Sequence, residues 1–189
     1  MAASTTANHP LAMNSTLIRT LARAVRPAIL LTLLAGAAAL PAQNPPPAPE
    51  TVGTIGQVGV GDGDRAATLS SVEIRLPQNW KGIRPWTGLS VVDGGTWWAG
   101  AGFIYDIPVT RRWVVTLGSG PFYYKSRDHS LGLDLEFYSF LEATGRVGRD
   151  TRIGLRVGHL SNAGFGRINP GVEDVVAVFV MPLGRHHAT

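Results

Sequence analysis

The segment "LEFYSFLEATGR" at residues 135–146 decides the fold class, because apolar and polar side chains alternate along it. Apolar Leu135, Phe137, Leu141 and Ala143 interleave with Glu136, Glu142, Thr144 and Arg146. Successive side chains of a β-strand point to opposite faces, so this pattern predicts a strand with one apolar face and one charged face.

The same alternation appears in "SSVEIRL" at 70–76 and in "RIGLRVG" at 152–158. Such runs are separated by Gly, Pro, Asp or Asn, which favour turns. We predict eight strands, at residues 52–60, 68–77, 82–92, 95–107, 112–124, 134–147, 150–161 and 173–182. About 9 to 11 tilted strand residues cross a bilayer, so the pattern predicts an all-β fold, an eight-stranded antiparallel transmembrane β-barrel of the outer membrane.

A soluble β-sandwich is the main alternative, because it would bury the apolar faces and expose the charged ones. Three observations favour the barrel: the strand lengths, an N-terminal segment typical of export, and the absence of cysteine from a chain expected to be exported. The absence of cysteine also excludes a disulfide framework and a thiolate metal site. No segment after residue 42 has eighteen consecutive apolar residues, which argues against a helical membrane protein.

The N-terminal segment has the layout of a secretory signal. Three arginines precede the uncharged run "AILLTLLAGAAALPA" at 28–42, which ends in small residues. We expect cleavage after Ala42, with Ala39 as a second candidate site and an uncleaved anchor as the alternative. The predicted organisation is a signal peptide at 1–42, a proline-rich lead-in at 43–51 and the barrel at 52–189.

The net charge gives no indication of a nucleic-acid partner. The whole chain carries 17 basic and 13 acidic residues, but the predicted signal holds three of the basic residues and none of the acidic ones. The expected mature chain therefore has 14 basic and 13 acidic residues, a net charge of +1, and the high isoelectric point reflects the targeting segment.

The charged faces of the predicted strands must pack inside the barrel. The interior of an eight-stranded barrel is just wide enough for side chains to fill, which favours paired internal charges over a polar conduit. The predicted internal set is Glu73, Arg75, Glu142, Arg146, Arg152, Arg156 and Asp174.

The link between the seventh and eighth strands is expected outside the cell. If the N-terminus lies in the periplasm, the connections from odd to even strands face outward and the others are short periplasmic turns. The stretch "HLSNAGFGRINPGVED" at 159–174 then lies at the outer-leaflet end of the barrel.

Three polar residues of this stretch fall on the lipid-facing side. His159 and Ser161 continue the apolar face of the seventh strand, and Glu173 shares its face with Val175 in the eighth. A hairpin turning near Gly166 places His159 opposite Glu173, with Ser161 two positions along the strand. A serine activated by a histidine that a carboxylate orients is the arrangement of a nucleophilic hydrolase.

The turn "NAG" at 162–164 offers hydrogen-bond donors for an oxyanion, namely backbone N–H groups and the Asn162 amide. An ionisable trio that faces lipid is costly without a purpose, which favours catalysis. The alternative interpretation takes His159 and Glu173 as interfacial polar residues at strand ends and the link between them as an ordinary loop.

The set His159, Ser161-Asn162-Ala163-Gly164, Asn169-Pro170-Gly171 and Glu173 resembles the signature of the outer-membrane lipid A 3-O-deacylase family, PagL. The resemblance implies an eight-stranded outer-membrane barrel whose Ser-His-Glu triad faces the outer leaflet and removes an acyl chain from lipid A. It also implies that Ser161 is the nucleophile, His159 the base and Glu173 the orienting acid. Asn162 and Gly164 become the candidate oxyanion donors.

The expected function is therefore that of an outer-membrane esterase of a Gram-negative bacterium, acting on lipid A or lipopolysaccharide without metal or cofactor. Substrate would arrive along the barrel wall, with Val157, Phe165 and Val175 as an acyl-chain groove. External basic residues are candidates for contact with lipid A phosphates, namely Lys125, Arg127 and Arg167. The alternatives are a non-catalytic structural barrel and an outer-membrane phospholipase, and the sequence leaves a homodimer open.

Overall fold

The computed structural model describes residues 48–59, 66–77, 80–148 and 150–183. The predicted signal peptide at 1–42 and most of the predicted lead-in lie outside the described residues. Within the described residues, no helix is long and apolar enough to cross a membrane.

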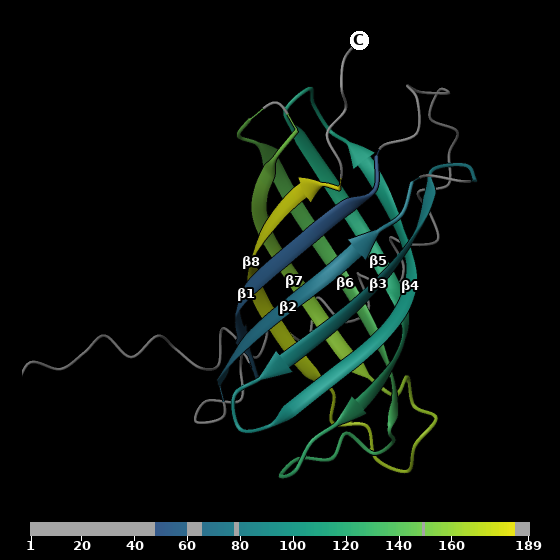
Figure 1. The fold of residues 1–189 in the computed structure, drawn as a ribbon. Coiled ribbons are helices and arrows are strands. Elements are labelled where there is room, and N and C mark those ends of the chain that lie inside the picture. The colour runs from purple at the N-terminus through teal and green to yellow at the C-terminus, as the bar shows by residue number, and fades with distance from the viewer. Residues whose placement is uncertain (1–47, 60–65, 78–79, 149, 184–189) are drawn as a thin grey trace, which may run out of the picture. The chain divides into compact units, whose positions relative to one another are not determined.

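Eight antiparallel strands form a closed barrel in which each strand pairs with the next and β8 pairs with β1 (Figure 1). The strands are β1 (Glu50–Val58), β2 (Ala67–Arg75), β3 (Ile83–Val92), β4 (Thr96–Pro108), β5 (Trp113–Lys125), β6 (Leu135–Arg146), β7 (Arg152–Ser161) and β8 (Val172–Pro182). The predicted fold is confirmed, and each of the eight predicted ranges contains most of one strand. β1 begins at Glu50, inside the range predicted for the lead-in.

The outer wall of the barrel is apolar, as the alternation predicted. Large apolar side chains stand exposed on every strand, among them Ile55, Val72, Leu89, Phe103, Tyr123, Leu141, Leu155 and Phe179. A continuous apolar outer surface is typical of barrels that face lipid. We call the barrel end with the β5–β6 and β7–β8 connections the loop end; β1 starts and β8 ends at the opposite end (Figure 1).

The middle of the barrel is held together by buried ion pairs. Arg75 donates to both oxygens of Glu142 at 3.0 and 2.7 Å, and Arg156 donates to Glu142 at 2.7 Å. Arg156 also pairs with Glu73, which Arg75 approaches from the other side. All four side chains are at most 3% exposed, so each charge is satisfied by an opposite charge rather than by water.

A second layer of ion pairs lies closer to the barrel end at which β1 starts, opposite the loop end. Arg84 donates to Glu50 at 2.9 Å and to Asp106 at 2.8 Å, and Arg152 donates to the other Glu50 oxygen at 3.0 Å. Glu50 thus explains why β1 starts earlier than predicted, since its carboxylate is anchored inside the barrel by two arginines.

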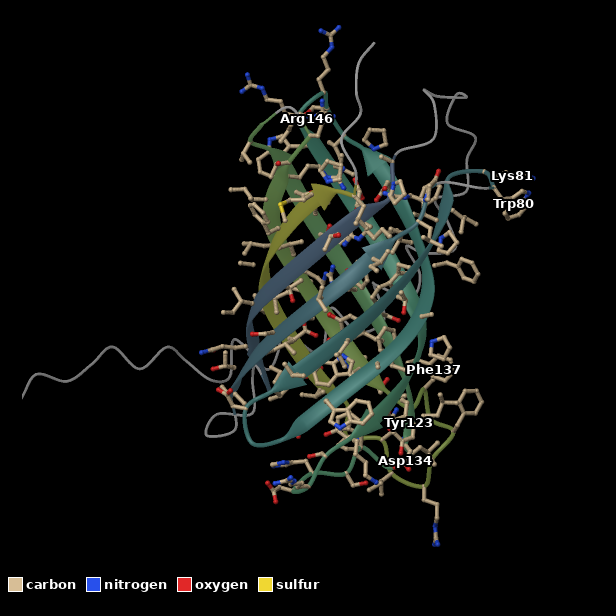
Figure 2. The ribbon with its side chains drawn as sticks, in the orientation of Figure 1. Trp80, Lys81, Tyr123, Asp134, Phe137 and Arg146 are labelled. Carbon is tan, nitrogen blue, oxygen red and sulfur yellow. The ribbon has the colours of Figure 1, made fainter. Side chains whose placement is uncertain are left out.

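The predicted internal set is correct except for Arg146, which is exposed. Arg146 is the last residue of β6, and its side chain lies at the rim of the barrel (Figure 2). Its backbone N–H donates to the Arg112 carbonyl in the neighbouring turn at 2.8 Å. The alternation predicts an inward direction, but at this position the strand has already reached the end of the barrel.

The loop-end half of the interior is filled by aromatic rings. The Trp86 ring lies 5.2 Å from Phe122 and 5.3 Å from Phe140, centroid to centroid, and Tyr138 packs against the same group. The Arg156 guanidinium lies 4.0 Å from the centre of the Phe140 ring, so the aromatic layer joins the ion pairs directly. This filled interior gives the rim of the loop end a rigid support.

Candidate active site

The β7–β8 ladder pairs His159 directly with Glu173, as the sequence predicted. The His159 Nδ1 atom lies 3.4 Å from Glu173 Oε1, and each side chain is about one-third exposed, at 35% and 34%. A carboxylate at this position can fix the imidazole orientation through Nδ1 and leave Nε2 for a reacting group.

Ser161 is the last residue of β7 and follows His159 on the same outward face. It is 9% exposed and lies opposite Phe137 of β6. Among the described residues, no hydrogen bond joins the Ser161 hydroxyl to the imidazole. The structure therefore pairs His159 with Glu173 and places Ser161 two residues further along the strand, without a described hydrogen bond between Ser161 and His159.

Gly171 supports the imidazole and was given no separate role by the sequence argument. Its φ angle of 63° is left-handed, and a Cβ built there would lie 2.7 Å from His159 Cε1 and 3.3 Å from Nε2. Only glycine combines this backbone angle with such a close approach. The dipeptide Pro170-Gly171 before β8 was the available signal, but only the fold shows that it contacts His159.

A tight turn begins immediately after Ser161. The Phe165 N–H donates to the Asn162 carbonyl at 3.0 Å, and both central residues, Ala163 and Gly164, have positive φ angles of 55° and 83°. These are the φ angles of a type I′ turn, whose first central position favours Asn, Asp or Gly, so alanine is uncommon there. Ala163 is therefore in a strained conformation next to the candidate nucleophile.

Asn162 is fully buried and organises the connection around this turn. Its side-chain N–H groups donate to the carbonyls of Leu131 at 2.9 Å and Ile168 at 2.7 Å. Its Oδ1 accepts from the Gly164 N–H at 3.0 Å, and its backbone N–H donates to Asn169 Oδ1 at 3.1 Å. The described arrangement thus engages the N–H donors of both candidate oxyanion residues, Asn162 and Gly164, within the loops.

Asn169 is a further candidate site residue, for which the sequence alone predicted no role. Its Oδ1 is held by the peptide N–H that follows Ser161, and among the described residues its Nδ2 group donates to no acceptor. The asparagine is exposed, so this N–H pair is accessible to a ligand.

The candidate substrate-binding residues lie on both sides of the candidate triad. Val157 and Val175 are paired directly across β7 and β8, next to the His159–Glu173 pair and on the same outward face. Phe165 is 77% exposed and its ring lies 6.0 Å from that of Phe137, which faces Ser161 from β6. Phe137, labelled at the loop end in Figure 2, is a further apolar contact that only the β6–β7 register reveals.

Exposed basic residues lie at the loop end together with exposed acidic ones such as Asp128 and Asp134, and the structure shows no metal centre in its described part. Lys125, Arg127 and Arg167 are all exposed and belong to the loop end. No group of three or more His, Cys, Asp and Glu side chains that could hold a metal ion occurs among the described residues.

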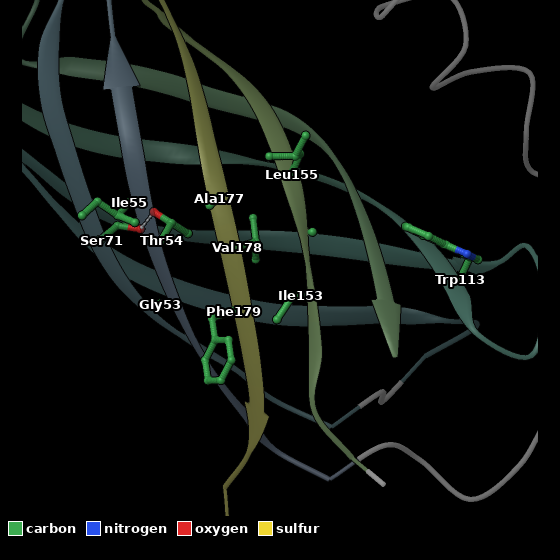
Figure 3. A pocket seen from close by; sticks show the side chains of 11 residues that line it. Gly53, Thr54, Ile55, Ser71, Trp113, Ile153, Leu155, Ala177, Val178 and Phe179 are labelled. Atoms are coloured by element: carbon green, nitrogen blue, oxygen red, sulfur yellow. Dashed lines mark hydrogen bonds between the residues drawn. The ribbon is translucent and has the colours of Figure 1, made fainter. Parts of the chain in front are cut away.

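A shallow apolar depression of about 660 Å³ lies on the outer wall, mainly where β1, β7 and β8 adjoin (Figure 3). Ile55, Leu155 and Phe179 surround the small residues Gly53 and Ala177. The residue pair of the depression that lies nearest to the candidate triad is Leu155–Ala177. The Val157–Val175 pair separates it from His159 and Glu173. The depression is therefore part of the apolar wall below the site and does not contain the candidate triad.

Comparison with known proteins gives one family and several similar folds. The family model described as "Lipid A 3-O-deacylase (PagL)" matches residues 71–182, more than half of the chain. No curated protein matches the sequence.

Among solved structures, the barrel is similar to one described as the outer membrane enzyme PagL, at 18% identity and a TM-score of 0.56, covering 71% of this chain and 99% of that one. A de novo designed transmembrane β-barrel matches at 10% identity and a TM-score of 0.54, covering 75% and 100%. Neisserial surface protein A matches at 8% identity and a TM-score of 0.53, covering 71% and 96%. At these identities the structural matches establish the fold.

Proposed function

The chain belongs to the lipid A 3-O-deacylase (PagL) family, and from this membership we propose that it is an outer-membrane serine esterase that releases an ester-linked acyl chain from the 3-position of lipid A. The observation that carries the proposal is the His159–Glu173 pair beside Ser161 on the lipid-facing wall. Export through the N-terminal segment 1–42 is part of the same proposal.

In the proposed reaction, Ser161 Oγ attacks the ester carbonyl while His159 Nε2 accepts the hydroxyl proton. Glu173 stabilises the imidazolium through Nδ1, from which its Oε1 lies 3.4 Å away. The tetrahedral intermediate then expels the sugar alkoxide, which takes the proton from His159 and leaves an acyl-Ser161 ester. A water molecule, deprotonated by His159, hydrolyses that ester to the free fatty acid and regenerates Ser161.

We propose that the Asn169 amide stabilises the oxyanion, in place of Asn162 and Gly164, the two donors predicted from the sequence. The side-chain and backbone N–H groups of Asn162 donate to loop acceptors, and the Gly164 N–H donates to Asn162. Asn169 is tied to the peptide after Ser161 through Oδ1, which leaves its Nδ2 hydrogens for the substrate. Asn162 then acts by shaping the loop.

Substrate is proposed to enter sideways from the outer leaflet. The Val157–Val175 pair and the Phe137–Phe165 ring contact supply apolar surface on either side of Ser161 for acyl chains. Lys125, Arg127 and Arg167 supply positive charge for the phosphates of lipid A at the same end.

The test is mass spectrometry of lipid A from cells that express the wild-type protein or Ser161→Ala, with barrel assembly checked by heat-modifiable gel mobility. We expect loss of one hydroxyacyl mass in the wild type alone. If Ser161→Ala is folded and equally active, the proposed mechanism is wrong. If both barrels are folded and lipid A is unchanged in both, release of fatty acid from phospholipid separates a phospholipase from a structural barrel.

A further inference from the structure

The β5–β6 loop, residues 126–134, is firmly seated on the barrel. Leu131 is 6% exposed and belongs to the hydrophobic core cluster, together with Leu160 of β7. The Leu133 N–H donates to the buried Glu136 carboxylate at 3.3 Å, and the Tyr124 N–H donates to the Asp134 carbonyl at 2.7 Å. The loop is thus fixed to the interior before it reaches the candidate active site.

The same loop holds the connection that follows Ser161. The Leu131 carbonyl accepts a hydrogen bond at 2.9 Å from Asn162, thirty-one residues away in sequence. Because Asn162 is adjacent to Ser161, and its own Nδ2 also reaches the Ile168 carbonyl, this bond connects the barrel core to both arms of the β7–β8 loop. Asn162 therefore depends on the β5–β6 loop for its position.

At Gly132 the two loops approach each other closely. Its φ angle is 107°, and a Cβ built on it would lie 2.3 Å from the Ile168 carbonyl oxygen and 2.7 Å from Asn162 Nδ2. The Ile168 contact is with backbone, so a side chain at 132 must displace the β7–β8 loop or the β5–β6 loop. No rotation of a neighbouring side chain relieves that contact.

We propose that Gly132 is a positioning residue for the esterase reaction, acting through Asn162 and the Ile168 carbonyl to set the place of the loop between Ser161 and Glu173. The inference rests on the proposed function and extends it to the β5–β6 loop, which contacts none of the reacting groups. Its consequence is that a residue 29 positions before the nucleophile determines part of the catalytic geometry.

The direct test is the Gly132→Ala variant of the full-length protein, assembled in detergent and compared with Gly94→Ala. Gly94 belongs to the β3–β4 turn and also has a positive φ angle, 86°, but a Cβ there meets nothing within 4 Å. Both variants therefore place alanine at a positive φ angle, and only Gly132→Ala brings its Cβ against the loop that follows Ser161. Assembly is scored by heat-modifiable mobility and turnover by release of fatty acid from purified lipid A.

For Gly132→Ala we expect kcat to fall about tenfold to a hundredfold with KM within about twofold, because displacement of a reacting group by about 1 Å costs up to a hundredfold in rate. Labelling of Ser161 by a small phosphonate ester that reacts with activated serines should slow in parallel. For Gly94→Ala we expect values close to wild type in both assays. Equal kinetics for the two folded variants would refute the positioning role.

A second pair of variants covers the case in which Gly132→Ala fails to assemble. Leu131→Ala removes the buried side chain that seats the loop, whereas Leu133→Ala removes a side chain that is 39% exposed in the same loop. We expect a lower kcat for Leu131→Ala only, and equal kcat values would contradict the inference. Wild-type activity that survives Ser161→Ala would instead refute the proposed function, and the inference with it.

Discussion

Glu173 lies directly across the β7–β8 ladder from His159, and its Oε1 atom is 3.4 Å from His159 Nδ1. On the other side of the imidazole, β6 contributes Ser139, whose hydroxyl oxygen lies 2.9 Å from that of Ser119. The histidine thus has a carboxylate on one flank and an already bonded hydroxyl on the other. Of these two flanking groups, only the Glu173 carboxylate carries a negative charge that can stabilise a positive charge on the ring.

Replacing Glu173 by Gln should lower kcat by about a thousandfold or more, because an amide cannot stabilise the imidazolium as a carboxylate does. Ser139→Ala, which alters the opposite flank of His159, serves as the control and should stay close to wild type. Steady-state release of fatty acid from lipid A measures both. Similar rates for Glu173→Gln and Ser139→Ala would rule out the proposed role of the carboxylate.

Gly171→Ala should impair catalysis more than assembly. The new Cβ would lie 2.7 Å from His159 Cε1, so the imidazole must move away from its present position. We expect a fall in kcat of about tenfold or more, since small displacements of a general base are costly. Heat-modifiable mobility should still report a folded barrel, and normal turnover by that folded variant would contradict the predicted contact.

Asn169 provides a prediction that separates loop support from oxyanion stabilisation. Asn169→Asp keeps an oxygen to accept the Asn162 N–H but loses the Nδ2 donor. If the donor stabilises the oxyanion, kcat falls by about a hundredfold to a thousandfold, as for other oxyanion donors. If the residue only supports the loop, Asn169→Asp should turn over lipid A like the wild type while Asn169→Ala should not.

Glu142→Ala should destabilise the barrel without touching the candidate active site. Its carboxylate accepts hydrogen bonds from Arg75 and Arg156, and its loss leaves two buried guanidinium groups undercompensated. Breaking a buried ion pair from one side typically costs about 3 to 5 kcal/mol, so the midpoint of denaturant unfolding should fall clearly. Arg146→Gln at the exposed rim should leave that midpoint nearly unchanged, and equal midpoints would argue against the ion-pair layer as a source of stability.

The sequence was sufficient to predict the barrel and the pairing of His159 with Glu173. Both depend on the two-residue period of a strand, because once the apolar face and the hairpin centre near Gly166 are known, the register follows. The same reasoning was wrong for Arg146, because alternation describes direction along a strand and does not indicate where the barrel ends.

The contacts that shape the β7–β8 loop could not be predicted from the sequence, for a different reason. Asn162 was expected to face an oxyanion, yet its amide is directed to Leu131 and Ile168. A bond between residues thirty-one positions apart depends on how two irregular loops meet, and neither loop has a periodicity from which that meeting can be predicted. Gly132 acquires its role only from the same long-range contacts, and Asn169 from a hydrogen bond with Asn162 inside the β7–β8 loop.

The free space next to Gly53 has a consequence for how the sequence of such a barrel can vary. A Cβ at this position on the outer wall meets nothing within 4 Å, while backbone ladders close the ring of strands and charges and aromatic rings fill its interior. Residues such as Gly53 on the outer wall therefore contribute little to the stability of the fold. Substitutions on the outer wall can therefore change the surface that contacts lipid. The set of accepted lipids can change in this way during evolution while the barrel fold stays the same.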